Sequence, residues 1–448
     1  MRFRSVVALI LIWTVVAGQP RVASAQPLSF IRDTELENTI RGYATPIFVA
    51  AGLDPTAVRI YLVNDKQINA FVAGGQNLFI NTGLLMQSED AGQVVGVIAH
   101  EVGHIAGGHL VRVHDALARG TAESILAMVL GAAAMVAGAP EVGAAVMSGG
   151  QNVAMRNFLQ YSRTQEASAD AAATRFLDAT QQSAKGLLDF FHMLSGQELL
   201  IAARQDPYLR THPLTEDRIE ALQSFVARSP YSNRPVRPEF QQQHQRMLAK
   251  LHAFLDDPSI TRRRYPDSDT SVPARYARAI VQHRTAQLDK AVGTIDGLIA
   301  EHPDDPYFQE LKGQILFESG KPSQALPPYQ RAVELLPDAP LLRLDLARVQ
   351  MATDRKDLLP AAIDNLRTSL RLEPKRPFVW RQLAIALGRN GQMGESSLAL
   401  AEEAMLLDKL SEAKFHAGRA LQDLPPGSAG RLQAEDIMQA AENAREDR

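Results

Sequence analysis

The chain has 448 residues and a net charge of −3, with 46% hydrophobic and 22% charged residues. This length suffices for two or three domains, and the composition is that of a globular protein. The near-neutral charge gives no sign of a nucleic-acid partner. The chain has no cysteine, which excludes thiol catalysis, disulfides and cysteine metal ligands, so any metal site must use His, Asp or Glu.

The first 25 residues have the pattern of a secretory signal peptide. Arg2 and Arg4 supply positive charge, residues 6–16 are apolar, and residues 23–25 (Ala-Ser-Ala) form a small-residue cleavage site. We expect cleavage after Ala25 and export to a bacterial periplasm. The alternative is an uncleaved anchor, although the apolar run is short for a membrane span.

The next segment predicts a helix and a small sheet. Residues 30–52 carry apolar residues at helical spacing, and residues 59–63 (RIYLV) predict a strand. Residues 69–85 place two glycines between two apolar runs, which is typical of a hairpin. This sheet either only packs on the helix that follows, or also presents an edge strand to an extended peptide substrate. Ser88 is the expected N-cap of that helix.

Residues 91–110 predict a mostly buried helix, which contains the sequence His100-Glu101-Val102-Gly103-His104. Positions i and i+4 share one helix face, so both histidines can bind one ion. Zinc suits neutral imidazole ligands with one position left open for water. The metal lowers the pKa of that water, and the glutamate can take its proton. A chance match is the alternative, but these groups would be costly to bury without a partner.

Two further features follow the motif. His109 lies about 140° further round the helix than His104, and we interpret His109 and His114 as structural or surface residues. Residues 125–148 are apolar but interrupted by Pro140. They are predicted to form either a core helical hairpin or a mobile flap over the active site or against a membrane surface.

A later helix, starting near Gln151, carries Glu166 and Asp170 on one face. Glu166 can be a third metal ligand, and Asp170 can accept a hydrogen bond from a ligand histidine. Two solvated carboxylates are the alternative. His212 precedes a proline at a predicted helix start; it is either a turn residue or a group near the zinc or a developing oxyanion. Arg218 could bind substrate carbonyls or a carboxylate.

From residue 272 onward the pattern changes to helical repeats with a period near 34 residues. Small, aromatic and proline residues within 306–339 stand at tetratricopeptide positions: Gly313, Gly320, Ala325, Tyr329, Ala332 and Pro337. Such units bury their apolar faces only by stacking on their neighbours. The pattern therefore predicts a curved α-solenoid with a concave binding surface, with a generic helical bundle as the alternative.

Three motifs together resemble the gluzincin family of zinc metallopeptidases that includes the CaaX prenyl proteases and the HtpX-type membrane proteases. They are H-E-x-x-H at 100–104, S-R-x-x-E-x-x-A-D at 162–170 and H-P-x-x-x-x-R at 212–218. The similarity covers about residues 30–225. It implies a mainly α protein, in which a zincin-type α+β domain with a small sheet precedes the α-solenoid. This chain departs from the integral-membrane relatives, whose transmembrane helices flank the catalytic domain.

The resemblance also implies roles for individual residues. One zinc ion per chain would be held by His100, His104 and Glu166, with Glu101 as the general base. Asp170 would support a ligand, and His212 and Arg218 would lie near the substrate. In periplasmic members with tetratricopeptide repeats, which this architecture resembles, the histidine matching His212 can occupy the fourth zinc position and hold the enzyme latent.

These observations predict an exported zinc endopeptidase that hydrolyses misfolded or stalled proteins, above all outer-membrane proteins. The expected division is signal peptide 1–25, metallopeptidase domain 26–227, helical connector 228–271 and repeat domain 272–448. The repeats would dock the outer-membrane assembly machinery, and residues 125–148 could make a peripheral membrane contact. The rival interpretation is a periplasmic chaperone or adaptor that acts through its repeats with little proteolysis.

Overall fold

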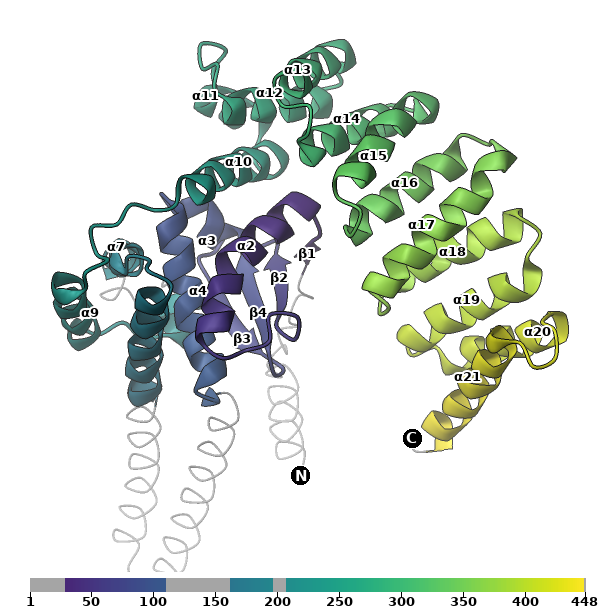
Figure 1. Ribbon diagram of the computed structural model, residues 1–448, viewed down its shortest axis with the longest axis horizontal. Helices are drawn as coiled ribbons and strands as arrows, with labels where there is room; N and C mark the ends of the chain where they lie inside the picture. The colour runs from purple at the N-terminus through teal and green to yellow at the C-terminus, as the bar shows by residue number, and fades with distance from the viewer. Residues whose placement is uncertain (1–28, 110–161, 196–206, 447–448) are drawn as a thin grey trace, which may run out of the picture.

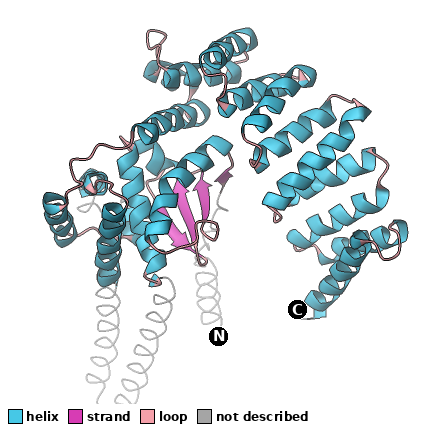
Figure 2. Cartoon of the chain, in the orientation of Figure 1, coloured by secondary structure: helices cyan, strands magenta, loops and turns pink. Residues whose placement is uncertain are grey.

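The computed structural model describes residues 29–109, 162–195 and 207–446. The predicted signal peptide, His114 and the apolar segment 125–148 lie outside the described residues. Figures 1 and 2 show a unit with one small sheet, followed by an arc of paired helices. Across the described ranges, no helix combines the length and the apolar character that a membrane crossing requires.

The sheet has four strands in the order β1-β2-β4-β3. They are β1 (Phe30–Ile31), β2 (Arg59–Val63), β3 (Ala70–Ala73) and β4 (Asn77–Asn81). β3 and β4 form the predicted hairpin, with Ala70 opposite Ile80, while β2 runs parallel to β4. β3 therefore lies at one edge of the sheet.

Two predicted helix starts are wrong. The segment predicted as a helix from Phe30 begins with β1, and α2 (Thr34–Ala50) starts only after Asp33, whose carboxylate accepts a hydrogen bond from the Leu36 amide. Ser88 ends α3 (Thr82–Gln87) and does not cap the next helix. α4 (Ala91–Ala106) is capped by Asp90, which accepts a hydrogen bond from the Gln93 amide. Both aspartates offer the side-chain acceptor that a free helix N-terminus needs.

One hydrophobic core holds this unit together. The strands contribute Leu62, Leu78 and Ile80, and α2 and α4 contribute residues such as Ile40 and Val97. The core is closed by the helix of residues 162–179, α7 (Lys185–Ser195), α8 (Pro207–Thr211) and α9 (Glu216–Arg228). Successive residues of a strand point to opposite faces, and residues at helical spacing share one face of α4. These two patterns place the apolar side chains on the faces that meet in this core.

α10 (Pro238–Leu255) packs on both parts of the molecule, and α11 (Pro258–Arg264) follows it. The Tyr43 hydroxyl of α2 donates a hydrogen bond to the Phe240 carbonyl at 2.8 Å. Further along α10, Ala249 and Ala253 belong to the same apolar cluster as Tyr276 of the first repeat helix. The domain boundaries predicted at residues 227 and 271 stay predictions.

The repeat region consists of consecutive helix pairs, and the α-solenoid prediction is confirmed. Its helices are α12 (Val272–Arg284), α13 (Leu288–Glu301), α14 (Pro306–Glu318), α15 (Pro322–Leu335), α16 (Pro340–Ala352), α17 (Leu359–Leu372, after the short η2, Lys356–Leu358), α18 (Pro377–Arg389), α19 (Met393–Leu406), α20 (Leu410–Asp423) and α21 (Ala429–Glu446). Each helix packs on its neighbour in the chain. The Tyr329 ring of α15, for example, fits against Gly313 of α14.

A buried ionic cluster joins the sheet-containing unit to α10 and the first repeat. The Lys250 ammonium lies 2.6 Å from the Asp33 carboxylate and 3.2 Å from Glu35. Arg246 lies 2.7 Å from the other oxygen of Glu35, and the Tyr276 hydroxyl donates a hydrogen bond to Glu35 at 2.8 Å. Burial would raise the pKa of Glu35, but Lys250 and Arg246 lower it. Three segments are thus connected through one buried carboxylate.

The arc of repeats also curves back toward the sheet (Figure 1). Arg32, directly after β1, donates to Glu373 between α17 and α18 at 2.9 Å. Two cavities of about 520 and 600 Å³ lie between the repeats and this side of the peptidase elements. The repeats are therefore attached at two places rather than by the chain connection alone.

Candidate metal centre

α4 carries three buried ionisable side chains in its second half. His100 and Glu101 have no exposed surface, and His104 is 7% exposed. Because His100 and His104 are four residues apart, their rings lie on the same helix face, with centroids 4.8 Å apart. The sequence-predicted pair therefore meets inside the protein.

The helix of residues 162–179 brings two carboxylates to this pair. Glu166 is 3% exposed and Asp170 is 8% exposed, so the alternative of two solvated carboxylates is excluded. The two helices approach closely because α4 has a glycine at the crossing: a Cβ on Gly103 would lie 2.7 Å from the Ala169 carbonyl oxygen. The glycine inside the motif thus sets the distance between the histidines and the carboxylates.

We expect Gly103→Ala to weaken metal binding by roughly tenfold or more, because an added methyl group must push the two helices apart. The measurement is the dissociation constant for zinc, obtained by competition with a chelator. Gly42→Ala is the matched control, since a Cβ at that position in α2 meets no atom within 4 Å. Equal zinc affinities for both variants would contradict this account of Gly103.

His100, His104, Glu166 and His212 form a four-residue cluster, in which one donor atom from each lies within 4.8 Å of the others. The Nε2 atoms of His100 and His104 are 3.1 Å apart. These two atoms lie 3.3 and 3.4 Å from the Glu166 carboxylate oxygens. The Nδ1 atom of His212 is 3.2 Å from Glu166.

The protonation of these rings indicates a cation at their centre. His100 Nδ1 lies 2.8 Å from Asp170, which as a carboxylate only accepts, so Nδ1 carries a proton and a neutral His100 presents a lone pair at Nε2. That lone pair faces the Nε2 atom of His104 at 3.1 Å. Glu166 and Asp170 pair with the one guanidinium of Arg218, and Glu101 lies 3.5 Å from His212, so three carboxylates stand beside one guanidinium. Two imidazoles and a carboxylate with this charge fit a Zn²⁺ ion.

Asp170 contacts His100 of the four-residue cluster, and Arg218 contacts Glu166. Arg218 donates through Nε and Nη2 to Asp170 at 2.6 and 2.9 Å, and its Nη1 lies 3.1 Å from Glu166. The same Nη1 donates to the Pro213 carbonyl at 2.7 Å. The side chain is 5% exposed, so it is engaged with the carboxylates before any substrate arrives. Binding of a carboxylate was one of the two roles that the sequence left open for Arg218.

The pKa values follow from burial and these contacts. Burial lowers the pKa of His100, but hydrogen bonds and charges from Asp170 and Glu166 outweigh it and raise the pKa to about 10. Burial lowers the pKa of His104 to about 3. Burial alone would raise the pKa of Glu166, but the His212 charge and hydrogen bonds from the other histidines hold it well below its usual range. A bound cation would replace the proton that His100 otherwise takes up.

Several polar atoms in this centre have no hydrogen-bond partner among the described residues: both carboxylate oxygens of Glu101, Nε2 of His212 and the hydroxyl of Tyr208. His212 Nε2 is 3.5 Å from a Glu101 oxygen, and the rings of Tyr208 and His212 lie 4.6 Å apart. Burial raises the pKa of Glu101. Buried polar atoms without partners mark a place where a ligand or water binds.

Two residues of the centre were missed in the sequence. His109 was interpreted as a structural or surface histidine, yet it is buried and its Nδ1 lies 2.9 Å from Nδ1 of His104. Tyr208 comes from α8, four residues before His212, and its ring faces the cluster histidines. The spacing of Tyr208 and His212 on one helical turn was the available signal.

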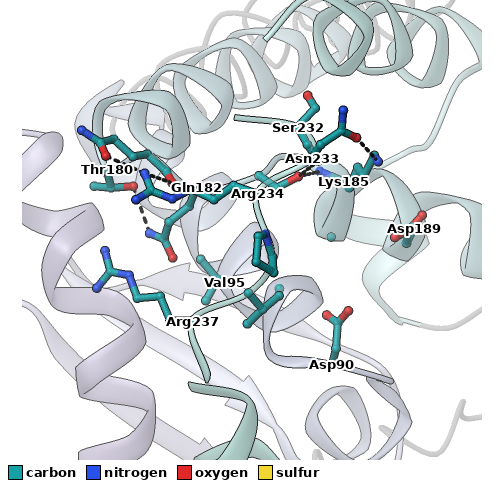
Figure 3. Close-up of a pocket in the computed structure, with 16 residues that line it drawn as sticks. Asp90, Val95, Thr180, Gln182, Lys185, Asp189, Ser232, Asn233, Arg234 and Arg237 are labelled. Carbon is teal, nitrogen blue, oxygen red and sulfur yellow. Dashed lines mark hydrogen bonds between the residues drawn. The ribbon is translucent and has the colours of Figure 1, made fainter. Parts of the chain in front are cut away.

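A separate pocket lies at the other end of α4, near its first residues (Figure 3). It has a volume of about 390 Å³, and its lining includes Asp90, Lys185 and Arg234. Lys185 donates to Asn233 at 2.9 Å, and Asp90 caps α4, so these charges already have partners in the chain. None of the clustered histidines or carboxylates lines this pocket.

A buried helix with the His-Glu-x-x-His motif, completed by a glutamate from a second helix, defines a metallopeptidase. Residues 31–226, which include the whole cluster, match the model of peptidase family M48.

The chain is also similar to three curated relatives over most of its length. The chain is 25% identical over 367 residues to the beta-barrel assembly-enhancing protease of Yersinia pestis, covering 80% of this chain and 73% of the relative. It is 23% identical over 331 residues to the protein of the same name from Escherichia coli K12, covering 72% of this chain and 66% of the relative. A relative from Vibrio cholerae is 25% identical over 282 residues, 62% of this chain and 58% of the relative.

Solved structures that resemble this chain include MamA, with 17% identity, a TM-score of 0.29, and coverage of 38% of this chain and 95% of that chain. YrrB, described as a TPR protein with an unusual peptide-binding site, has 17% identity and a TM-score of 0.32. It covers 39% of this chain and 90% of that chain.

Proposed function

We propose that this chain is an exported zinc endopeptidase that hydrolyses misfolded or stalled proteins, chiefly outer-membrane proteins. The observation that carries the proposal is that the Nε2 atoms of His100 and His104 face each other at 3.1 Å. The neighbouring Glu101 carboxylate has no hydrogen-bond partner among the described residues. The match to an M48 peptidase domain supports it. The named activity of the relatives supports the substrate class.

In this proposal His100, His104 and Glu166 hold one zinc ion. Zinc, when bound, supplies a Lewis acid that lowers the pKa of a water molecule and polarises the scissile carbonyl. Asp170 accepts the Nδ1 proton of His100 and so fixes the tautomer in which Nε2 is free. Arg218 orients Asp170 and Glu166, which removes their freedom to rotate away from the histidines.

Glu101 is the proposed general base and acid. A carboxylate oxygen of Glu101 takes a proton from the attacking water and later passes it to the nitrogen of the leaving amine. Burial raises the pKa of this carboxyl above its usual range, which favours its taking up a proton. Its neighbours in the core exclude bulk water, since the side chain has no exposed surface.

The edge strand β3 is the proposed substrate platform. β3 pairs only with β4 among the described strands, and it packs beside α4. An extended peptide can add to such an edge through main-chain hydrogen bonds, which suits an unfolded substrate of varied sequence. In this proposal the sheet both packs on α4 and presents an edge strand to the substrate, the two roles that the sequence left open.

The repeats are the proposed docking domain for the outer-membrane assembly machinery, and the periplasm is the proposed compartment. A peripheral membrane contact through residues 125–148 stays a prediction. The second candidate function is a periplasmic adaptor with little proteolysis. The attachment of the repeats to the peptidase elements through Lys250 and Arg32 favours a combined role. A Glu101→Gln strain separates the two, because an adaptor would keep its full cellular effect.

Metal removal tests the main proposal. We expect one zinc ion per purified chain and cleavage of an unfolded protein that stops with a chelator and returns with added zinc. Zinc without cleavage would indicate a latent enzyme. A sample that neither holds zinc nor cleaves any unfolded protein would leave the repeats as the functional part and overturn the peptidase assignment.

His212 is the proposed latch, because its Nδ1 lies 3.2 Å from Glu166 while its Nε2 lies 3.5 Å from Glu101. It therefore stands where a substrate carbonyl must approach. We expect His212→Ala to raise the basal cleavage rate several-fold, measured with an unfolded protein at saturating zinc. His192→Ala, an exposed histidine of α7, is the control. A lower rate in His212→Ala would instead make His212 a residue that stabilises the transition state.

A further inference from the structure

His109 lies just beyond the end of α4, after a two-glycine turn. The helix ends at Ala106, and Gly107 is its C-cap. Gly108 has a φ of +63°, a left-handed conformation that favours glycine. This turn ends the regular helical rotation, so the position of His109 no longer follows from helix geometry. The imidazole of His109 instead contacts His104 of α4.

The His109 ring lies against a ligand histidine. Nδ1 of His109 is 2.9 Å from Nδ1 of His104, and the two rings meet edge to face with centroids 4.9 Å apart. His109 is 3% exposed. A Cβ on Gly107 would lie 2.3 Å from Nε2 of His109, so the ring packs directly on the glycine. The two-glycine turn therefore fixes the position of the His109 ring against His104.

The two Nδ1 atoms can form a hydrogen bond only if one carries a proton and the other a lone pair. Nε2 of His104 faces the cluster at 3.1 Å from His100 Nε2, and there it must present a lone pair to bind a metal. A neutral His104 then carries its proton on Nδ1 and donates it to Nδ1 of His109. His100 has Asp170 for the same purpose, so each ligand histidine has its own acceptor.

We propose that His109 is a positioning residue for the metal centre: as a neutral imidazole it accepts the Nδ1 proton of His104 and fixes the tautomer and ring orientation that bind zinc. This inference rests on the proposed zinc site and adds to it. His109 acts on the metal centre through its contact with His104. Partners of this kind contribute about 10- to 100-fold to metal affinity in other proteins.

The test is the zinc affinity of the full chain, measured by competition with a chelator of known affinity. His109→Asn places an acceptor oxygen near the position of Nδ1, His109→Gln places it near Nε2, and His109→Leu removes it. We expect His109→Asn to stay within about threefold of the unmodified protein, and the other two variants to bind zinc about 10- to 100-fold more weakly. Selective ¹⁵N labelling of histidine should show His104 protonated at Nδ1 in the zinc-loaded protein.

His244→Leu is the matched control, because His244 is equally buried but hydrogen-bonded to the Ser88 carbonyl, away from the cluster. Thermal unfolding of the metal-free variants shows whether each is folded; if His109→Leu is not, His109→Gln carries the test. Unchanged zinc affinity in His109→Gln and His109→Leu would overturn the inference alone, and so would equal losses in all three variants. An unmodified protein that binds no zinc would overturn the proposed function as well.

Discussion

Replacing Glu101 by glutamine is expected to abolish peptide hydrolysis while leaving zinc bound. The substitution keeps the size of the side chain but removes the oxygen that takes the proton from water, a contribution of roughly 10²- to 10⁴-fold for a general base. Glu101 does not belong to the four-residue cluster whose donor atoms converge, so the metal should remain. The measurement pairs the cleavage rate of an unfolded protein with the zinc content of the same sample.

Glu89→Gln is the control for this experiment, because it makes the same chemical change at an exposed position just before α4. It should cleave at the rate of the unmodified protein. If Glu101→Gln cleaves as fast as Glu89→Gln in a preparation free of other proteases, Glu101 is not the base. A loss of zinc in Glu101→Gln would instead show that this carboxylate contributes to metal binding.

Lys250→Met is expected to cause a large loss of stability. Lys250 is 4% exposed and pairs with Asp33 and with the buried Glu35, so its removal takes a buried cation from Asp33 and leaves Glu35 with Arg246 alone of its two cations. Breaking a buried ion pair in this way costs about 3–5 kcal/mol. We expect the apparent midpoint of thermal unfolding to fall by roughly 5–10 °C. Circular dichroism follows the unfolding, and limited proteolysis reports whether the repeats separate from the peptidase elements.

Lys66→Met serves as the comparison, because the Lys66 side chain is 76% exposed and should contribute little. The double change Lys250→Met with Glu35→Gln should recover part of the loss, since it lowers the excess negative charge that Lys250→Met leaves in the cluster. If Lys250→Met is no less stable than Lys66→Met, the cluster does not hold the two parts together. The separate contact between Arg32 and Glu373 would then be the more important attachment.

The places where the sequence misled are informative. The rotation of 100° per residue put His109 away from the metal face, but that rule holds only while a helix continues, and α4 ends at Ala106. Ser88 was chosen as a cap although Asp90 lies closer to the first helical turn and bonds the Gln93 amide. Arg218 was expected to bind substrate carbonyls or a carboxylate; it donates to the Asp170 carboxylate, and its place near the substrate stays a prediction.

What the sequence determined by itself is the local chemistry. The spacing of His100 and His104 forces both rings onto one face of a helix, the two glycines between β3 and β4 give a hairpin, and a period near 34 residues gives stacked helix pairs. These outcomes depend only on neighbours in the chain. Helix and turn geometry therefore suffices to predict them.

The tertiary structure alone decided which distant residues meet. The Gly103 crossing brings Glu166 and Asp170 to the histidines, and α10 brings Lys250 to the carboxylates beside α2. Each contact joins segments whose relative placement is set by how large apolar faces pack in the core. No local pattern encodes that packing, because the same helix face can be buried against many partners until the whole fold selects one.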